Sequence, residues 1–276
     1  MKQLISKLED VKNSGLCMGC GACAGVCPSF CVTMAESSKG SIEPQIIHEL
    51  CNECGLCLKV CPGYELDFVR ITKEIYGSYP DNVELGHFRA LYSGHSTDYD
   101  LRQTTQSGGM VSTLLIHLLE VEKIDGAVVT RWYQDNPFAT ETFIAKTREE
   151  ILSASLSKYV PVPADEIIRF IIDTEGRYAF VGTPCQIHGL RKTERVLPLL
   201  KDRIVLYVGL HCQGVFTRYF PRRILAMAGV KEEDVKQFFF RSKARWGWPC
   251  HVRIETIDGM LKDIRREKST VPIRSF

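Results

Sequence analysis

The sequence predicts two units in series, a small cysteine-rich α+β module over residues 1–70 and an α/β domain over residues 89–276. Nine of the twelve cysteines lie between Cys17 and Cys61, which sets the first unit apart. In the second unit, apolar segments of strand length alternate with segments of helical periodicity, a pattern typical of α/β domains. The stretch between them, residues 71–88, is rich in turn-forming residues, and we interpret it as a linker.

Hydrophobic patterning predicts the elements of the second unit in order. Strands are expected over residues 90–95, 126–132, 140–146, 178–182 and 203–209, and helices over residues 109–122, 163–174, from about 186 onward, and 217–228. Leu114, Leu115 and Leu118 share one stripe of the first helix, whereas residues 178–182 form the short apolar run expected of a buried strand. Asp258-Gly259 between two further apolar runs predicts a hairpin near the end.

The cysteines of the first unit follow one pattern twice. The first run is Cys17, Cys20, Cys23 and Cys27 before Pro28, and the second is Cys51, Cys54, Cys57 and Cys61 before Pro62. Both read C-x2-C-x2-C-x3-C-P, and the second run begins 34 residues after the first. In such runs three cysteines hold one 4Fe-4S cluster, and the fourth ligates the other cluster. The pattern assigns Cys17, Cys20, Cys23 and Cys61 to one cluster, and Cys51, Cys54, Cys57 and Cys27 to a second.

Structural zinc is the alternative for these cysteines. Zinc sites use two cysteine pairs, or cysteine with histidine, rather than repeated three-then-one runs ending in proline. We therefore favour a two-cluster ferredoxin-type module, with Cys31, outside both runs, as a buried thiol. Because most of the chain follows this module, its clusters are expected to pass electrons to or from a second centre.

Charge and hydropathy exclude several classes of partner. The net charge is only +2, from 35 basic and 33 acidic residues, so neither a nucleic acid nor an anionic membrane surface is expected as a partner. No apolar run approaches the roughly 18 residues that span a bilayer, so no direct membrane insertion is expected. The first fifteen or so residues lack the apolar core of a signal peptide, and a cytoplasmic location is expected.

Two turns and one lysine in the second unit are candidate ligand-binding residues. Ser107, Gly108 and Gly109 open a helix, where backbone N–H groups suit a phosphate, although an ordinary helix cap is the simpler interpretation. Thr183, Pro184, Cys185 and Gln186 follow a buried strand, at the end of a sheet where ligands bind, and a plain turn with a buried cysteine is equally compatible. Lys158 could balance negative charge on a bound group, while a solvated lysine is the default.

Taken in order, four segments of the second unit resemble the family of coenzyme F420 hydrogenase/dehydrogenase beta subunits. They are residues 105–111, 157–160, 181–191 and 209–212, and the Gly-Thr-Pro-Cys-Gln run within the third is the most specific. The resemblance covers the chain from about residue 88, and family members with a ferredoxin module in front are common. It implies an α/β flavin-binding domain in which Ser107, Gly108 and Gly109 cradle a phosphate of FAD, Thr183, Pro184, Cys185 and Gln186 line the flavin pocket, and Lys158 is catalytic.

The resemblance implies an oxidoreductase subunit. It would couple two-electron hydride exchange with coenzyme F420, through FAD, to one-electron transfer through the two clusters, which suits a flavin because flavins carry out both chemistries. A redox partner protein or a larger hydrogenase, dehydrogenase or reductase complex is the implied partner. The alternatives are a ferredoxin-dependent flavoprotein reductase of another substrate, such as 7-hydroxymethyl chlorophyll a, and a non-catalytic electron-transfer adaptor.

The sequence departs from the family pattern in one respect. Family members usually continue with a further C-x2-C segment, whereas this sequence ends at Phe276 before any such segment. We therefore expect the natural domain to continue. By resemblance, Cys185 and Cys212 would ligate a third 4Fe-4S cluster only together with those additional cysteines, because two thiolates cannot hold a cluster alone.

Overall fold

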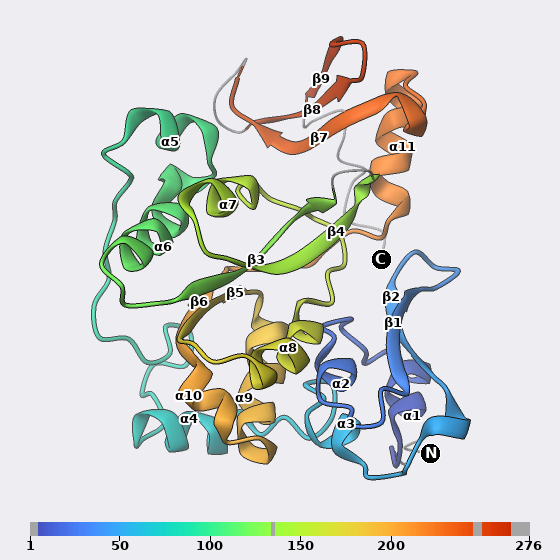
Figure 1. The fold of residues 1–276 in the computed structure, drawn as a ribbon, viewed down its shortest axis with the longest axis vertical. Helices are drawn as coiled ribbons and strands as arrows, with labels where there is room; N and C mark the ends of the chain where they lie inside the picture. The colour runs from blue at the N-terminus through green and yellow to red at the C-terminus, as the bar shows by residue number, and fades with distance from the viewer. Residues whose placement is uncertain (1–4, 134–135, 245–249, 266–276) are drawn as a thin grey trace.

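The computed structural model describes residues 5–133, 136–244 and 250–265, which form three sheets with helices packed around them (Figure 1). The cluster module contains α1 (Leu8–Asn13), α2 (Ala22–Gly25), β1 (Val32–Glu36), β2 (Ile42–Ile46), a 3-10 turn (His48–Leu50) and α3 (Leu56–Lys59). The strands β1 and β2 pair antiparallel. Helices α2 and α3 are single turns, and each begins after a left-handed glycine, Gly21 with φ 92° and Gly55 with φ 70°. The sequence repeat is therefore also a repeat of local structure.

A four-stranded sheet in the order β4-β3-β5-β6 forms the centre of the second unit. It consists of β3 (Gly126–Tyr133), β4 (Asn136–Ala145), β5 (Tyr178–Gly182) and β6 (Ile204–Gly209). The strands β3, β5 and β6 are parallel, and β4 is an antiparallel edge strand. The helices around it are α5 (Tyr99–Thr104), α6 (Met110–Glu120) and α7 (Arg148–Ser153) on one face, with α8 (Ile168–Asp173), α9 (Pro184–Val196) and α10 (Leu199–Arg203) on the other. An α/β fold over this stretch is confirmed.

The last part of the described chain forms a separate antiparallel sheet. It comprises β7 (Val235–Ser242), β8 (His251–Thr256) and β9 (Leu261–Arg265), preceded by α11 (Tyr219–Ala228) and a 3-10 turn (Glu232–Asp234). Phe238, Ile254 and Ile224 pack together with Phe138 of β4, which joins this sheet to the central one. The hairpin predicted around Asp258-Gly259 is confirmed, whereas β7 was not predicted.

Two sequence-based expectations differ from the structure between the two units. The strand expected over residues 90–95 is wrong: this segment is irregular, and Leu91 and Tyr92 are 75% and 93% exposed. A short apolar run forms a strand only where a neighbouring strand and a core receive it. Helix α4 (Phe68–Tyr76) lies partly within the predicted linker and is capped by the Asp67 side chain. Its apolar residues remain outside the core clusters.

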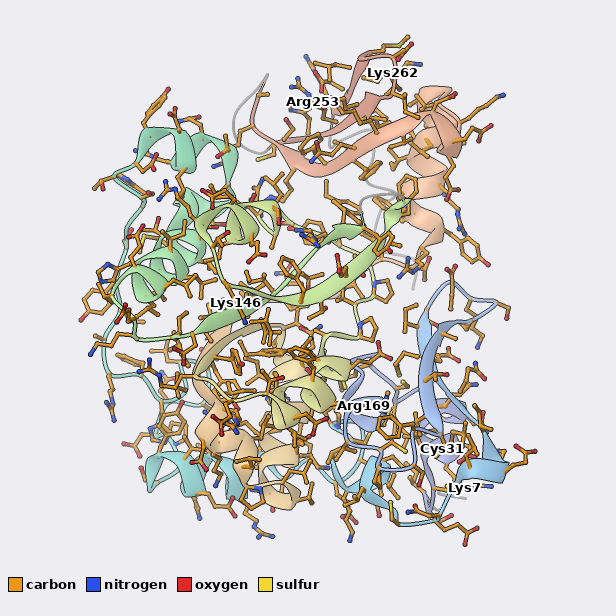
Figure 2. The ribbon with its side chains drawn as sticks, in the orientation of Figure 1. Lys7, Cys31, Lys146, Arg169, Arg253 and Lys262 are labelled. Carbon is orange, nitrogen blue, oxygen red and sulfur yellow. The ribbon has the colours of Figure 1, made fainter. Side chains whose placement is uncertain are left out.

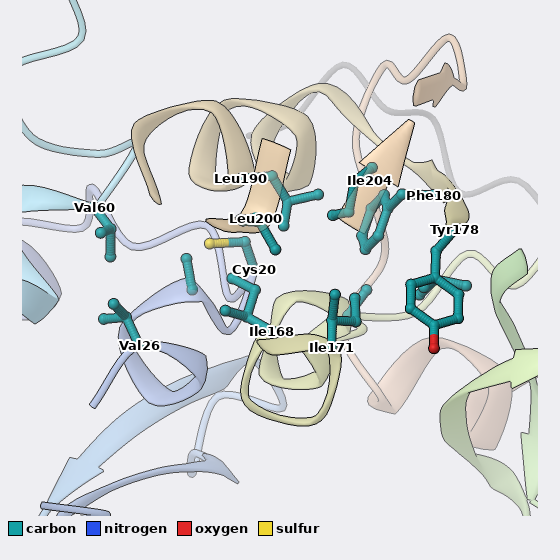
Figure 3. Packing of buried hydrophobic residues seen from close by; sticks show 13 residues of the cluster. Cys20, Val26, Val60, Ile168, Ile171, Tyr178, Phe180, Leu190, Leu200 and Ile204 are labelled. Atoms are coloured by element: carbon teal, nitrogen blue, oxygen red, sulfur yellow. The ribbon is translucent and has the colours of Figure 1, made fainter. Parts of the chain in front are cut away.

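The cluster module and the α/β domain share a hydrophobic core. Cys20, Val26 and Val60 of the module pack in one cluster with Ile168 of α8 and Leu190 of α9, as Figure 3 shows. The same cluster continues through Phe180, Leu200 and Ile204 to the central sheet. Burial of these side chains contributes about 1.5–3 kcal/mol for each large apolar residue. Loss of order in the cluster module would therefore expose part of the core of the second unit.

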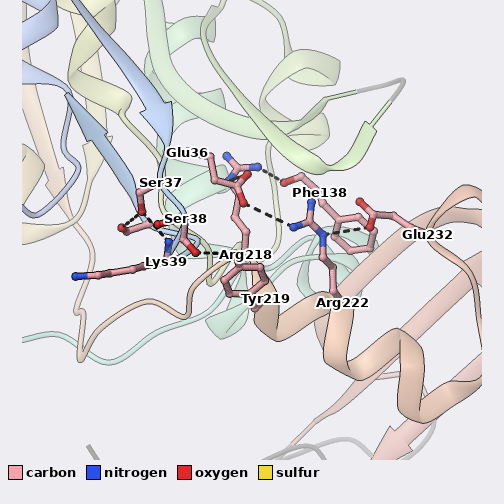
Figure 4. A network of polar contacts seen from close by, with 10 residues as sticks. Glu36, Ser37, Ser38, Lys39, Phe138, Arg218, Tyr219, Arg222 and Glu232 are labelled. Carbon is pink, nitrogen blue, oxygen red and sulfur yellow. Dashed lines mark hydrogen bonds and ion pairs between the residues drawn. The ribbon is translucent and has the colours of Figure 1, made fainter. Parts of the chain in front are cut away.

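A polar contact attaches the hairpin of the module to α11 (Figure 4). Arg218 pairs with Glu36 at 3.7 Å and donates a hydrogen bond to the Phe138 carbonyl at 2.6 Å. Tyr219 donates its hydroxyl proton to the Ser38 carbonyl at 2.8 Å. The module is thus held at two places, an apolar one at α8 and α9 and a polar one at α11. Within the described residues, no helix combines the length and apolar character needed to cross a bilayer.

Candidate iron–sulfur centres and the adjoining cysteine pair

Cys17, Cys20, Cys23 and Cys61 line a single cavity with an empty volume of about 350 Å³. These are the four cysteines that the spacing assigns to the first cluster. The rest of the cavity wall is mainly apolar and includes Leu8, Val11, Met34, Pro44 and Pro62. Cys20, Cys23 and Cys61 are buried, and Cys17 is half-buried. We call this cavity the first site, and the ligand role of its cysteines stays a prediction.

The donor set of the first site fits a 4Fe-4S cluster better than a zinc ion. Within the part of the chain that the structure describes, no three His, Cys, Asp or Glu side chains lie close enough together to hold one metal ion. Tetrahedral zinc requires its sulfur ligands at about 2.3 Å from a common centre. In a 4Fe-4S cube each cysteine binds a different iron, so the four sulfurs stand farther apart around a larger volume. A cavity lined by four separated thiols meets that requirement.

Backbone N–H groups point at the sulfurs of the first site. The amides of Gly19, Ala22 and Ala24 donate to Cys17, Cys20 and Cys23 respectively. Burial nevertheless raises the pKa of each of these thiols, because a charged sulfur is poorly solvated there. Binding to iron requires the thiolates, so the amides supply hydrogen bonds to the charge that a cluster brings.

The second site is made by Cys27, Cys51, Cys54 and Cys57. Burial, followed by the neighbouring thiols Cys27, Cys54 and Cys51, raises the pKa of Cys57 to about 11. Cys51 and Cys54 are exposed, unlike the buried cysteines of the first site. Cys57 also interacts electrostatically with Cys23, so the two sites adjoin. An electron reaching the module from solvent therefore meets the second site before the first.

Cys31 lies against the second site, although it belongs to neither cysteine run. Its Sγ is 3.4 Å from the Sγ of Cys27, and its side chain is 2% exposed. Burial and the contact with Cys27 raise the pKa of Cys31 to about 12. Burial acts in the same direction on Cys27, but hydrogen bonds from Cys31 and from nearby backbone amides outweigh it and lower the pKa of Cys27. Cys31 is thus the thiol of the pair and the hydrogen-bond donor. The expectation of a buried thiol is confirmed.

Helix α9 forms one wall of the first site. Lys192, which is 7% exposed, donates a hydrogen bond to the Cys61 carbonyl at 2.7 Å and another to the Tyr64 carbonyl. Gly189 lies so close to the module that an added Cβ would stand 3.6 Å from the Sγ of Cys20 and 3.0 Å from the Cβ of Ala22. The α/β domain therefore holds the loop that carries the fourth cysteine of the first site.

Asp165 lies between the first site and a cysteine of the α/β domain. Its backbone N–H donates to the Cys20 carbonyl at 2.9 Å, and its side chain interacts electrostatically with Cys20 and Cys185. The carboxyl group is fully buried, which raises its pKa, and neither oxygen has a hydrogen-bond partner among the described residues. Sequence reasoning missed Asp165 and Lys192, because neither belongs to a motif and their importance arises only where the two units meet.

Cys185 and Cys212 follow neighbouring parallel strands and interact electrostatically. Cys185 is the second residue of α9, and Cys212 follows β6, where its Sγ accepts a hydrogen bond from the Gly214 N–H at 3.3 Å. The structure thus brings together the two cysteines that the resemblance assigns to a third cluster. It also brings Cys185 near the first site, since Cys20 and Cys185 influence one another's pKa.

Ser107, Gly108 and Gly109 form a 3-10 turn directly before α6, with φ values of 47°, 75° and 78°. The two glycines are also required by packing, because a Cβ on Gly109 would lie 2.4 Å from Leu101 and one on Gly108 would lie 2.9 Å from His95. No side chain caps the first turn of α6. The turn can therefore present backbone N–H groups to an anion, and the fold alone also explains its glycines.

Thr183 and Gln186 form the N-terminal cap of α9. The Thr183 N–H donates to Oε1 of Gln186 at 2.7 Å, while the Gln186 amide donates to the Val162 carbonyl at 2.9 Å. Pro184 occupies the first turn, where a missing N–H costs nothing. These contacts leave Gln186 buried within the fold. This turn packs with α8–α10, whereas the turn at Ser107–Gly109 packs with α5–α6, on the other face of the sheet.

Lys158 binds the backbone of its own loop. Its Nζ donates to the carbonyls of Ala154, Ser155 and Leu156 at 2.7, 2.7 and 3.1 Å. Burial lowers the pKa of Lys158 to about 7. The three carbonyl acceptors act in the opposite direction, because a neutral amine has only two protons to donate. In this structure the ammonium group closes the end of α7 (Arg148–Ser153).

Comparison with known families agrees with both halves of the chain. Residues 91–169 match "Coenzyme F420 hydrogenase/dehydrogenase, beta subunit N-term", and residues 175–274 match the companion description for the C-terminal part of the same protein. The chain belongs to the family of coenzyme F420 hydrogenase/dehydrogenase beta subunits. In this family member, residues 16–63 also match a "4Fe-4S dicluster domain", the segment that contains all eight predicted ligands.

Three relatives illustrate the range of names among these beta subunits. The chain is 28% identical over 84% of its length to "Coenzyme F420-dependent sulfite reductase" of Methanocaldococcus jannaschii, and covers 36% of that protein. It is 27% identical over 94% of its length to a subunit of the F(420)H(2) dehydrogenase of Methanosarcina mazei, covering 71% of it. It is 26% identical over 56% of its length to "7-hydroxymethyl chlorophyll a reductase, chloroplastic" of Oryza sativa subsp. japonica, covering 31% of it. The chain thus spans only about a third of the sulfite reductase and of the rice protein.

Proposed function

We propose that this chain is an iron–sulfur subunit of an oxidoreductase that exchanges hydride with coenzyme F420, through FAD, and carries single electrons through two 4Fe-4S clusters. The observation that carries the proposal is the linear order of the thiol sites. An exposed second site adjoins a buried first site, which in turn adjoins Cys185 and Cys212 in the α/β domain. Such an order suits a path between the protein surface and a buried two-electron centre.

The outer end of this path would face a redox partner. Cys51 and Cys54 are exposed, so a cluster at the second site would lie close enough to solvent to exchange electrons with another protein. The first site is closed off by α9 and by the apolar lining around it. We therefore propose that a partner protein, or a neighbouring subunit of a larger hydrogenase, dehydrogenase or reductase complex, approaches the second site.

Bound FAD would supply the conversion between two-electron hydride chemistry and one-electron transfer. The N–H groups at Ser107, Gly108 and Gly109 would bind a phosphate group, because no side chain caps α6 there. Thr183, Pro184, Cys185 and Gln186 would line the flavin pocket as the start of α9. Lys158 would shape this region through the loop whose three carbonyls it binds, and it would act catalytically if one of those contacts is exchanged for the cofactor.

Anaerobic purification with iron, sulfide and flavin measured together tests the proposal. Two 4Fe-4S clusters correspond to about eight irons per chain, and one flavin per chain is expected beside them. Oxidation of reduced F420 should then proceed with a one-electron dye as acceptor. In Lys158→Ala we expect slower turnover at unchanged iron content, with the exposed Lys146→Ala as control. Iron-free protein, or zinc in its place, would refute the proposal.

Two alternatives have specific support. The name of the rice relative supports a ferredoxin-dependent flavoprotein reductase of another substrate, for which flavin would be bound but reduced F420 would not be oxidised. The internal contacts of Gln186 and Lys158 support a non-catalytic electron-transfer adaptor, for which the iron would be present without flavin. A third cluster at Cys185 and Cys212 would require further ligands and would raise the iron content to about twelve.

A further inference from the structure

A fifth cysteine lies inside the second site, where four ligands suffice. Cys31 is fully enclosed, with its Sγ 3.4 Å from that of Cys27, and it also interacts electrostatically with Cys51. Both neighbours are predicted ligands of the same cluster. The three thiols therefore face a common space, and Cys31 has no role in the two-cluster pattern.

The backbone directs Cys31 into this position. The preceding residue, Phe30, has a left-handed φ of 53°, an uncommon conformation for a non-glycine side chain. Arg169 of α8 fixes that turn, since its guanidinium lies 4.0 Å over the Phe30 ring and donates to the Ala24 carbonyl at 2.7 Å. Figure 2 shows Arg169 on the side of α8 that faces the module, where Cys31 lies. A hydrogen bond from the Ile47 N–H to the Cys31 carbonyl, at 2.8 Å, holds the other side.

The internal repeat supplies a comparison within the same chain. The residue 34 positions after Cys31 is Glu65, which is exposed, so the second cysteine run carries no equivalent thiol. Cys61, the counterpart of Cys27, instead has the Lys192 ammonium beside its loop. The fifth cysteine is therefore particular to the second site and is not a consequence of the duplicated motif.

We infer that Cys31 is a reserve ligand of the second cluster, able to take the place of Cys27 on the same iron. In the resting arrangement the Cys31 thiol donates a hydrogen bond to the Cys27 sulfur. In the exchange, the Cys31 sulfur gives up its proton as it binds the iron, and the Cys27 sulfur takes up a proton as it leaves. One iron–sulfur bond forms and one breaks, and no electron is transferred. The inference rests on the proposed pair of clusters.

Four variants of the full chain, purified anaerobically, test this inference by iron and sulfide content and by the electron paramagnetic resonance of the reduced protein. We expect about eight irons in Cys27→Ala and in Cys31→Ala, as in the wild type, and about four in the double variant Cys27→Ala/Cys31→Ala. Cys61→Ala is the matched control at the first site, and we expect it to lose its cluster because no spare thiol adjoins it among the described residues.

Equal iron loss in Cys27→Ala and in the double variant would overturn the inference, as would cluster loss in Cys31→Ala alone, which would make Cys31 an obligatory ligand. The resonance of the first cluster reports folding in every second-site variant. Should Cys27→Ala fail to fold, Cys27→Ser with and without Cys31 gives the same comparison. Wild-type protein without iron would refute the proposed function itself, whereas a wild type with about eight irons and an iron-poor Cys27→Ala would refute only the reserve ligand.

Discussion

Replacing Lys192 by methionine tests whether α9 holds the first cluster in place. The change removes the buried hydrogen bonds to the Cys61 and Tyr64 carbonyls. A buried acceptor that loses its partner costs about 1–3 kcal/mol, so the two together should cost about 2–5 kcal/mol. Methionine is unbranched and adaptable, so little of this cost should come from a cavity. The loss of a positive charge beside Cys61 should also lower the reduction potential of the first cluster.

The assay is iron release to a chelator, together with thermal unfolding of the anaerobic protein and a redox titration of each cluster. We expect Lys192→Met to release about half of its iron faster than the wild type, with the potential of the second cluster unchanged. Lys201→Met is the control, because Lys201 is an exposed lysine on α10 (Leu199–Arg203). Iron retention and unfolding temperature equal to those of the wild type would refute the view that α9 supports the first site.

Further predictions concern α9, α7 and the shared core. Gly189→Ala should destabilise the protein by about 1–3 kcal/mol and release iron from the first site, because its Cβ would lie 2.5 Å from the Asp165 carboxylate; Gly209→Ala, with open space around it, is the control for unfolding and iron content. Lys158→Met should lower the unfolding temperature at unchanged iron content, since three carbonyls lose their donor, and iron loss would contradict this. Chelation of the iron should lower the unfolding temperature of the α/β domain too, and unchanged circular-dichroism melting of that domain would argue against a shared core.

The sequence alone determined the features that depend on local spacing. Thiols two residues apart next to left-handed glycines can surround a cluster with very little supporting structure, so the duplicated motif was readable directly. The strands over residues 126–132, 178–182 and 203–209 and the helix of α6 followed from apolar periodicity, because each has a continuous face to bury. The run over residues 90–95 looked like a strand for the same reason but found no partner in the fold.

Only the tertiary structure decided how the two units are joined and which side chains support the sites. Lys192, Gly189 and Asp165 are unremarkable in the sequence, and they matter because α9 and the turn before α8 pack directly against the first cysteine run. The approach of Cys31 to Cys27 likewise depends on a left-handed residue that Arg169 holds from a distant helix. Contacts between residues more than a hundred positions apart leave no periodic trace in a single sequence. The physical reason is that such contacts form through packing of whole elements rather than through local propensity.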